Sequence, residues 1–379
     1  MNYDFNEDEQ QLRDAVAKWV ERGYAFERRR QIAQAGGFSA EAWAELADLG
    51  VLGLGTPEAD GGLALGPVAA MLALEALGRG LVLEPVAPVA LVAASVLAKA
   101  PDAIRAAWLP RLVAGEARVV LAHQERAARY RLQHVDTRAE RTGDGWRIEG
   151  AKSLVPIGDV AEAFIVPARV EGEPDDPEGI ALFLVQRASP GVTTRGYALQ
   201  DGSRAAELVL ASAPGERLVD TASGFAALEE AVDIGIAALA AEAIGAMDRL
   251  FELTVDYLNT RKQFGVPIGT FQALRHRVAD MKMQLELARS MSYFATLKLR
   301  DPAPSRRRAI AQSKVQLGRS MRFVGQQAIQ LHGGIGMTDE YIGSHYFKRL
   351  TTMEMQYGDT MHHLGEVSAR MQETAGVFA

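Results

Sequence analysis

The stretch Gln330-Leu331-His332-Gly333-Gly334-Ile335-Gly336-Met337 ends a helical pattern that begins at about residue 306. Its two adjacent glycines are typical of a helix C-terminus, because glycine readily adopts the left-handed conformation that ends many helices. Two further helices are predicted before this pattern, one following residue 225 and one over about 272–299. With a last helical pair at about 338–371, the C-terminal part of the chain is predicted to be a four-helix bundle.

Upstream of this bundle, from about residue 116 to 214, the chain changes to short runs rich in β-branched and aromatic residues. The runs are 118–122, 146–149, 163–166, 180–185 and 207–210. Thr142-Gly143-Asp144-Gly145 lies between two candidate strands and has the composition of a hairpin turn. We therefore predict a small sheet or barrel-like β domain in the middle of the chain.

The N-terminal part again has a helical pattern. Asn6 followed by Glu9 has the form of a capping box, and an amphipathic helix follows it. The apolar stretch 81–97 is interrupted by Glu84 and two prolines, which favours buried helices with a bend over a membrane span. The chain is thus predicted to be mainly α with a central β domain. The predicted domains are an N-terminal helical domain at 1–115, a middle β domain at 116–222 and a C-terminal helical bundle at 223–379.

Composition excludes several kinds of protein. With 379 residues, 48% hydrophobic and 23% charged, the chain resembles an ordinary globular protein of more than one subdomain. A formal net charge of -7 argues against a nucleic-acid-binding surface. Cysteine is absent, which excludes disulfides, thiolate metal sites and a cysteine nucleophile, and which fits a cytoplasmic protein.

Three motifs identify a family. Residues 330–337, together with Arg261-Lys262-Gln263-Phe264-Gly265 and Tyr357-Gly358-Asp359-Thr360, resemble the flavin-binding and catalytic end of acyl-CoA dehydrogenases, and the resemblance extends over the whole chain. It implies the acyl-CoA dehydrogenase fold and FAD-dependent oxidation of an acyl-CoA thioester to the 2-enoyl thioester. It also implies an electron-transfer flavoprotein as acceptor and an oligomer, usually a dimer of dimers.

The resemblance also implies which residues contact FAD. In this family the helical bundle of one subunit supplies much of the site for the ADP half of its neighbour's FAD. The implied FAD contacts here are Arg261, Gln263, Phe264, Gln272, Gln330, Gly333, Gly334, Thr360 and His362. Arginine can bind a pyrophosphate bidentately, and glycines allow close backbone approach. Taken singly, Phe264 has a simpler reading as a core residue, and the glycine pair as a helix terminator.

The catalytic base departs from the family pattern. The family usually reads Tyr-Glu-Gly-Thr where this chain reads Tyr357-Gly358-Asp359-Thr360, and the missing Glu removes the α-proton of the substrate. If this segment is helical, Asp359 points about 100° away from the position of that Glu. Asp359 is the only catalytic candidate, and the usual position of the base is Gly358.

Two more segments depart in the same direction. The alternative position of the base on the helix after the β domain is Gly235, where the nearby Glu230 and Asp233 have the simpler reading of a negative first helical turn. The β-domain segments expected to hold the flavin ring read Gln124 to Arg131 and Leu154-Val155-Pro156, which lack the family's residues.

These departures lead to three hypotheses. The first is an acyl-CoA dehydrogenase subunit that works with a paralogous partner, as in heteromeric family members of steroid and dicarboxylate breakdown. The second is a self-sufficient homo-oligomeric dehydrogenase that uses Asp359 as base. The third is a flavoprotein of the same fold that oxidises a non-CoA substrate, or a purely structural subunit.

Two other groups of residues have weaker functional readings. Arg126, Arg129 and Arg131 could bind a CoA phosphate or a distal carboxylate of the substrate, or they could be a solvated surface. His362 and His363 are adjacent, but no further residue with metal-ligand spacing accompanies them, so no metal is expected.

Overall fold

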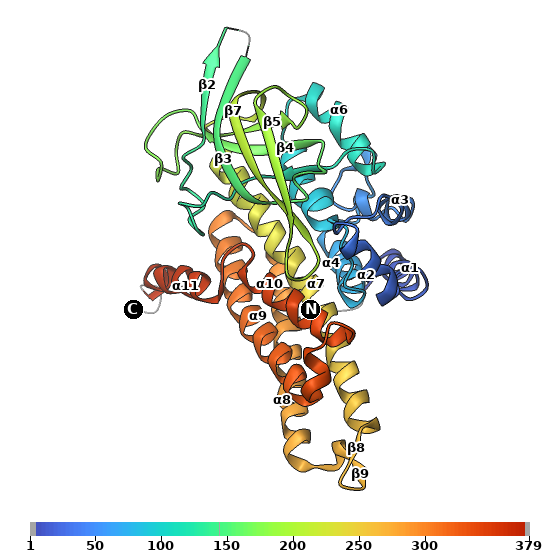
Figure 1. Ribbon diagram of the computed structural model, residues 1–379. Helices are drawn as coiled ribbons and strands as arrows, with labels where there is room; N and C mark the ends of the chain where they lie inside the picture. Colours follow the sequence, from blue (N-terminus) through green and yellow to red (C-terminus); the bar gives the residue numbers. More distant parts are fainter. Residues whose placement is uncertain (1–4, 144, 376–379) are drawn as a thin grey trace. The chain divides into compact units, whose positions relative to one another are not determined.

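The computed structural model describes residues 5–143 and 145–375 of the chain (Figure 1). The chain packs into two compact units. One unit comprises residues 1–30, 67–82 and 236–379, and the other comprises residues 31–66 and 83–235. The predicted division into three sequence domains stays a prediction.

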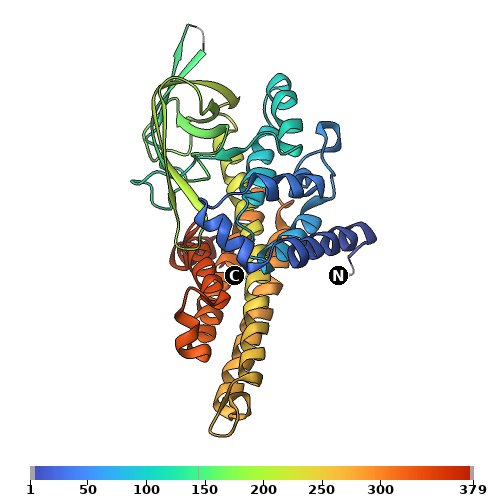
Figure 2. The ribbon, with the colours of Figure 1, turned by 45° about the vertical axis from the view of Figure 1, so that its right-hand side comes forward.

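The first unit is a helical bundle. Its elements are α1 (Glu7–Gly23), α4 (Gly66–Arg79), the second part of α7 (Gly224–Thr260), β8 (Lys262–Gln263), β9 (Val266–Pro267), η4 (Ile268–Thr270), α8 (Gln272–Lys298), α9 (Ala303–His332), η5 (Gly333–Met337), α10 (Ile342–Met355) and α11 (Thr360–Ala375). The β8–β9 hairpin joins α7 to α8 at the end of the bundle (Figure 2). The predicted bundle helices are confirmed.

The bundle core is made of aliphatic side chains that repeat at helical spacing. Leu250 on α7, Leu285 on α8, Met321 on α9 and Leu350 on α10 are all buried in one cluster. Full burial of such a side chain contributes roughly 1.5–3 kcal/mol, so these helices are held mainly by their shared apolar faces.

Helices α4 and α7 approach each other through a reciprocal pair of glycines. A Cβ added to Gly78 would lie 2.0 Å from the carbonyl oxygen of Glu242, and one added to Gly245 would lie 1.9 Å from that of Glu75. Both distances are far below a van der Waals contact. Neither position can therefore carry a side chain while the two helices keep this spacing.

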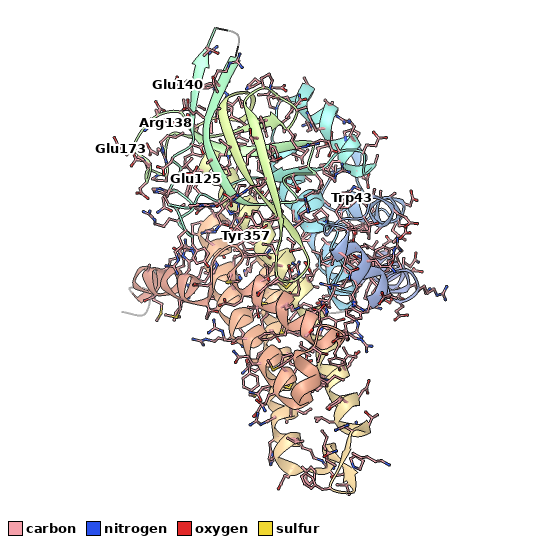
Figure 3. The ribbon with its side chains drawn as sticks, in the orientation of Figure 1. Trp43, Glu125, Arg138, Glu140, Glu173 and Tyr357 are labelled. Carbon is pink, nitrogen blue, oxygen red and sulfur yellow. The ribbon has the colours of Figure 1, made fainter. Side chains whose placement is uncertain are left out.

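The second unit combines short helices with the β strands. It contains most of α2 (Phe26–Gln34), α3 (Ala40–Asp48), η1 (Val51–Gly53), η2 (Glu58–Asp60), the π-helix η3 (Ala87–Ala93), α5 (Ala94–Leu97), α6 (Asp102–Val113), β1 (Val119–Leu121), β2 (Arg138–Thr142), β3 (Gly145–Pro156), β4 (Ala163–Arg169), β5 (Ile180–Gln186), β6 (Val192–Ala198) and β7 (Arg204–Val219). Buried Trp43, labelled in Figure 3, anchors α3 by donating its indole N–H to the carbonyl of Gly115 at 3.0 Å.

The strands form a closed, barrel-like sheet. The order β1-β4-β2-β3-β7-β5 closes because β4 also pairs with β5, and β6 adds to β7. All residues of β4 are buried, whereas only Ala139 is buried in β2. The β2–β3 hairpin extends beyond the barrel (Figure 1), and β2 is largely exposed, with Ala139 buried opposite Ile148. The predicted helix–barrel–helix fold is confirmed.

Local predictions succeeded where the sequence signal was strong. The capping box is present, because the Glu9 amide donates to Asn6 Oδ1 and the Asn6 amide donates to Glu9 Oε2, both at 2.9 Å. Strand β7 is much longer than the predicted run 207–210, and β2 and β6 were not predicted. In the predicted hairpin turn, Asp144 lies outside the described residues. No helix of the described chain is both long and apolar enough to cross a membrane.

Candidate functional site

The candidate residues of the bundle fall into two groups at different levels of α9. One group surrounds His332 at the end of α9, and the other surrounds Lys314 near its middle. The two positions are 18 residues apart (332 − 314), which corresponds to about 27 Å along the helix axis. We call the first group the bundle tip (residues 261–272 and 330–337) and the second the α10–α11 turn (residues 356–359).

The hairpin half of the bundle tip is held by its backbone and leaves its side chains open. The amide of Ile268 donates to the carbonyl of Arg261 at 2.8 Å, which closes the hairpin. Phe264 adopts a left-handed backbone (φ 56°) and is 91% exposed, with only an edge-to-face contact to Phe271 at 5.9 Å. The alternative reading of Phe264 as a core residue is therefore wrong. Arg261, Gln263 and Gln272 are also exposed.

The glycine half of the bundle tip follows α9. Gly333 has a φ of +63° and ends the helix, and its amide bonds to the last turn. A Cβ added to Gly333 or Gly334 would meet nothing within 4 Å, so the backbone here is open on its outer side. The ring of Tyr257, just before the hairpin, lies 4.6 Å from that of His332, and Gln330 is exposed beside it. The structure therefore brings the two halves of the bundle tip together.

The α10–α11 turn has a different character. Residues 356–359 lie between two helices, so the expectation that Asp359 is rotated by 100° on a helix is wrong. Tyr357 and Gly358 both have left-handed backbones, with φ of 57° and 104°. A Cβ on Gly358 would lie 2.5 Å from Cδ2 of His362 and 2.8 Å from Nε2 of His363. A side chain at the usual position of the base would therefore force these two histidines to move. Tyr357, labelled in Figure 3, marks this turn.

The carboxylate of Asp359 is the N-cap of α11. Its Oδ1 accepts the backbone N–H of His362 at 2.8 Å, as N-cap carboxylates do. Glu354, the last buried acid of α10, accepts both the amide and the hydroxyl of Thr360, at 3.1 and 2.7 Å. Thr360 and His362 therefore lie in the first turn of α11, next to the α10–α11 turn, and the structure does not bring them together with the bundle tip.

Lys314, a buried lysine that sequence reasoning missed, bonds to the end of α10 just before the turn. Lys314 on α9 has no exposed surface and donates its ammonium to the carbonyls of Met353 and Glu354, at 2.8 and 3.0 Å. Burial lowers the pKa of Lys314 to about 7, although the carboxylates of Glu354 and Asp359 oppose this shift. The available signal was its place in the apolar stripe of α9, since Ile310 and Leu317 lie one turn to either side.

His363 closes the turn from above. Its Nε2 lies 2.9 Å from the carbonyl of Tyr357, and the side chain is 3% exposed. Burial, and then the nearby Lys314, lower the pKa of His363 to about 3, so the imidazole is neutral and Nε2 donates. Because His363 holds the carbonyl of the residue before Gly358, it fixes the left-handed backbone of the turn.

The other departures lie in the second unit. Gly235 lies within α7, which begins at Gly224, so the reading of Glu230 and Asp233 as a negative first helical turn is wrong. Asp233 is also fully buried. The segment 124–131 forms turns and not a strand. Arg126 pairs with Glu207 at 3.4 Å and Arg131 with Asp175 at 2.6 Å, so acids of this chain already partner two of the three arginines.

One residue of the 124–131 segment is structural. Glu125, labelled in Figure 3, is buried and accepts from Lys152 at 2.6 Å and from the hydroxyl of Thr137 at 2.7 Å. Burial raises the pKa of Glu125, but Lys152 and these hydrogen bonds outweigh burial and lower it. This pair anchors the segment to the barrel.

The second predicted flavin segment ends β3. Leu154 has a left-handed backbone (φ 52°) and is 45% exposed, and Pro156 pairs with Ala205 on β7. The segment supplies neither an aromatic wall nor a hydroxyl, and Pro156 has no N–H to donate. Among the described residues, no three His, Cys, Asp or Glu side chains are grouped to hold a metal ion.

Comparisons with known proteins agree on one family. Three family models match in sequence order: acyl-CoA dehydrogenase, N-terminal domain, over residues 6–116; middle domain, over 121–211; and C-terminal domain, over 222–372. The chain is 31% identical to acyl-CoA dehydrogenase FadE12 of Mycobacterium tuberculosis over 350 residues, which cover 89% of this chain and 88% of FadE12. It is 28% identical to FadE27 of the same organism, over 89% of each chain.

Two solved structures of similar fold each carry the names of two proteins. A variant of the Tcur3481-Tcur3483 steroid ACAD matches with a TM-score of 0.88 and 30% identity over 98% of this chain and 99% of the other. The ChsE4-ChsE5 complex from Mycobacterium tuberculosis matches with a TM-score of 0.90 and 26% identity over 99% of this chain and 100% of the other.

Proposed function

This chain belongs to the acyl-CoA dehydrogenase family, whose members are FAD-dependent oxidoreductases, and we propose that it is one subunit of a hetero-oligomeric acyl-CoA dehydrogenase. In this proposal, a paralogous partner carries the catalytic carboxylate and the cradle of the flavin ring. This chain completes the cofactor site of that partner through its bundle tip.

The α10–α11 turn carries the proposal. Removal of the α-proton of a thioester needs a carboxylate that lies free in contact with the α-carbon. Gly358 has no side chain, and its surroundings leave no space for one. Oδ1 of Asp359 accepts a backbone N–H from the first turn of α11. We therefore propose that Asp359 acts as a helix cap and not as a base.

The bundle tip fits the ADP half of FAD. A pyrophosphate needs a cation and closely approaching backbone; Arg261 is exposed at the hairpin half of the tip, and Gly333 and Gly334 offer open backbone at the glycine half. Gln272 and Phe264 offer an exposed amide and an exposed ring. When bound, FAD accepts the two electrons of the oxidation. The segments 124–131 and 154–156 fit the flavin ring less well than the bundle tip fits the ADP half.

Substrate and partners follow from resemblance. The motifs at 261–272, 326–337 and 358–359 resemble the small subunit of pimeloyl-CoA dehydrogenase, which favours the acyl-CoA thioester of a fatty or dicarboxylic acid. The steroid ACAD and the ChsE4-ChsE5 complex support pairing of two different chains. We further propose a dimer-of-dimers tetramer, an electron-transfer flavoprotein as acceptor and a cytoplasmic location.

The test is the flavin content of the chain, purified alone and after co-expression with a paralogous chain that retains the Tyr-Glu-Gly-Thr motif. We expect little flavin absorbance alone and a flavin-loaded, active complex with the partner. A yellow, active homo-oligomer would sink the proposal. In that case Asp359→Asn decides the alternative, because loss of flavin bleaching by acyl-CoA would identify Asp359 as the base.

A further inference from the structure

His332 occupies the centre of the bundle tip. It is 3% exposed, lies directly before Gly333, and belongs to none of the predicted contacts. Its Nδ1 lies 2.8 Å from the carbonyl of Ala328, and its Nε2 lies 2.7 Å from the hydroxyl of Tyr341. Both ring nitrogens are thus bonded within the bundle, so the ring has one fixed orientation.

Three polar groups surround the ring of His332. The carbonyl of Ala328 lies 2.8 Å from Nδ1, the hydroxyl of Tyr341 lies 2.7 Å from Nε2, and the backbone carbonyl of Leu253 on α7 also accepts from the ring. Burial lowers the pKa of His332 and outweighs the two carbonyls, so the imidazole is neutral. Burial also raises the pKa of Tyr341, which keeps this hydroxyl protonated. His332 therefore connects Tyr341 and α7 to the last turn of α9.

Two aromatic rings enclose the imidazole. The ring of Tyr257 lies 4.6 Å away on the α7 side, and the ring of Tyr341 lies 4.8 Å away on the α10 side. Tyr257 precedes Arg261 by one turn, and its carbonyl accepts the Arg261 amide at 2.8 Å. His332 therefore contacts the helix that carries the hairpin half of the bundle tip as well as the helix that carries the glycine half.

The loop after α9 wraps around His332. Gly336 is buried, and a Cβ there would lie 3.0 Å from Cβ of His332 and 2.9 Å from the carbonyl of Ile329. On the outer side, Gly333 and Gly334 remain open. The inner face of residues 333–337 thus rests on the histidine, while the outer face is free for a ligand.

We infer that His332, bonded to Tyr341 and enclosed by Tyr257, is the positioning residue that fixes the Gly333–Gly334 backbone for the ADP half of FAD. The inference rests on the proposed function for its ligand, but the placement of the loop is a property of this chain alone. His332 does not touch the cofactor in this scheme. It sets the backbone that does.

The first test is amide hydrogen exchange of the chain alone. We expect the amides of residues 334–337 to exchange several-fold faster in His332→Phe and in Tyr341→Phe than in the unmodified chain, because each change removes a bond that holds the loop. His332→Gln, which keeps an acceptor and a donor, should recover most of the protection. Tyr346→Phe is the matched control, because it removes a buried tyrosine hydroxyl bond of the same helix, to the carbonyl of Arg79.

The second test is FAD release from the complex with the partner, followed by flavin fluorescence. His332→Phe and Tyr341→Phe should release FAD up to about tenfold faster than the unmodified complex. Tyr341→Phe, which changes a single oxygen, guards against a simple folding defect. Unchanged exchange, or unchanged FAD release despite faster exchange, would overturn the inference. The control omits this chain and measures the flavin retention of the partner alone. If the partner retains its flavin equally well, the proposed function fails. The hydrogen-exchange result would still show whether His332 fixes the loop.

Discussion

The bundle tip and the α10–α11 turn are parts of one helical bundle, but they differ in exposure. The tip leaves its groups open to solvent, whereas the polar groups around the turn bond within the chain. At the tip, Phe264 is 91% exposed and the backbone at Gly333 and Gly334 faces open space. At the turn, Lys314, Glu354 and Asp359 each bond to backbone or side-chain groups of the same chain.

The residues predicted from one set of family motifs thus lie in two regions with different surroundings. Exposed aromatic and basic groups contribute little to the stability of the free chain, but they can stabilise a complex when a ligand covers them. A turn whose polar groups are bonded internally gains nothing from a ligand and tolerates little change. We therefore expect a ligand at the bundle tip and a purely structural role for the α10–α11 turn.

The largest effect is expected at the turn, from Lys314→Met. Loss of the ammonium leaves the buried carbonyls of Met353 and Glu354 without these bonds, so the free energy of unfolding should fall by about 3 kcal/mol. Urea denaturation measures it. Lys282→Met on α8 is the control, because the exposed pair of Lys282 with Glu286 is worth about 0.5 kcal/mol or less. Equal stability of the two variants would contradict the view of the turn as a closed structure.

Gly358→Ala should have the next largest effect. The methyl group meets both histidines and forces a left-handed backbone on alanine, which together should cost about 2 kcal/mol. Thermal or urea unfolding is again the measurement. Gly365→Ala, in the open on α11, should instead stabilise the chain by about 0.5–1 kcal/mol. A neutral Gly358→Ala would mean that the turn can rearrange to accept a side chain.

The pH dependence of stability sharpens the comparison further. The unfolded chain protonates His363 near its ordinary pKa of 6.5, but the folded chain does so only near 3. The unfolded state therefore binds more protons between these values, so this contribution is complete above pH 6.5 and is lost as the pH falls. From pH 6.5 to 5.5, the unmodified chain should lose about 1 kcal/mol more than His363→Gln, because the unfolded histidine is already half protonated at pH 6.5. His276→Gln, an exposed change on α8, should keep the unmodified pH dependence.

The smallest effect on stability is expected at the bundle tip. Phe264→Ala should change the free energy of unfolding by less than about 0.5 kcal/mol, because the ring is almost fully exposed. In the complex, the same change should weaken FAD retention, which fluorescence can follow. A destabilised chain with normal FAD retention would show that the tip serves folding and not a ligand.

The sequence predicted elements whose pattern is local. Asn6 and Glu9 form the expected capping box because both bonds depend on residues three apart. Strand β2 escaped notice because the run Arg138–Thr142 alternates charges and buries a single alanine, which leaves no apolar signal. In β7, the predicted run 207–210 covers only part of the strand, because Ser212, Pro214 and Gly215 break the apolar signal after it.

The site was predictable only in part, for the same reason. The tip residues Arg261, Gly333 and Gly334 follow from motifs. The role of Asp359 does not, because it depends on where one helix ends and the next begins. Lys314, His332 and His363 act through partners from 6 to 40 residues away, as in the bond from Lys314 to the carbonyl of Glu354. A lysine in an apolar helical stripe is the one signal that could have been read.

The crowding around Gly358 also bears on evolutionary history. A glutamate restored there by a single substitution would displace His362 and His363 and would strain the turn before it could serve any reaction. With total stabilities of about 5–15 kcal/mol, such an intermediate starts at a disadvantage. The return of a catalytic base at this position therefore requires several coordinated changes. Because no single substitution is favoured by selection, the loss of the base is difficult to reverse.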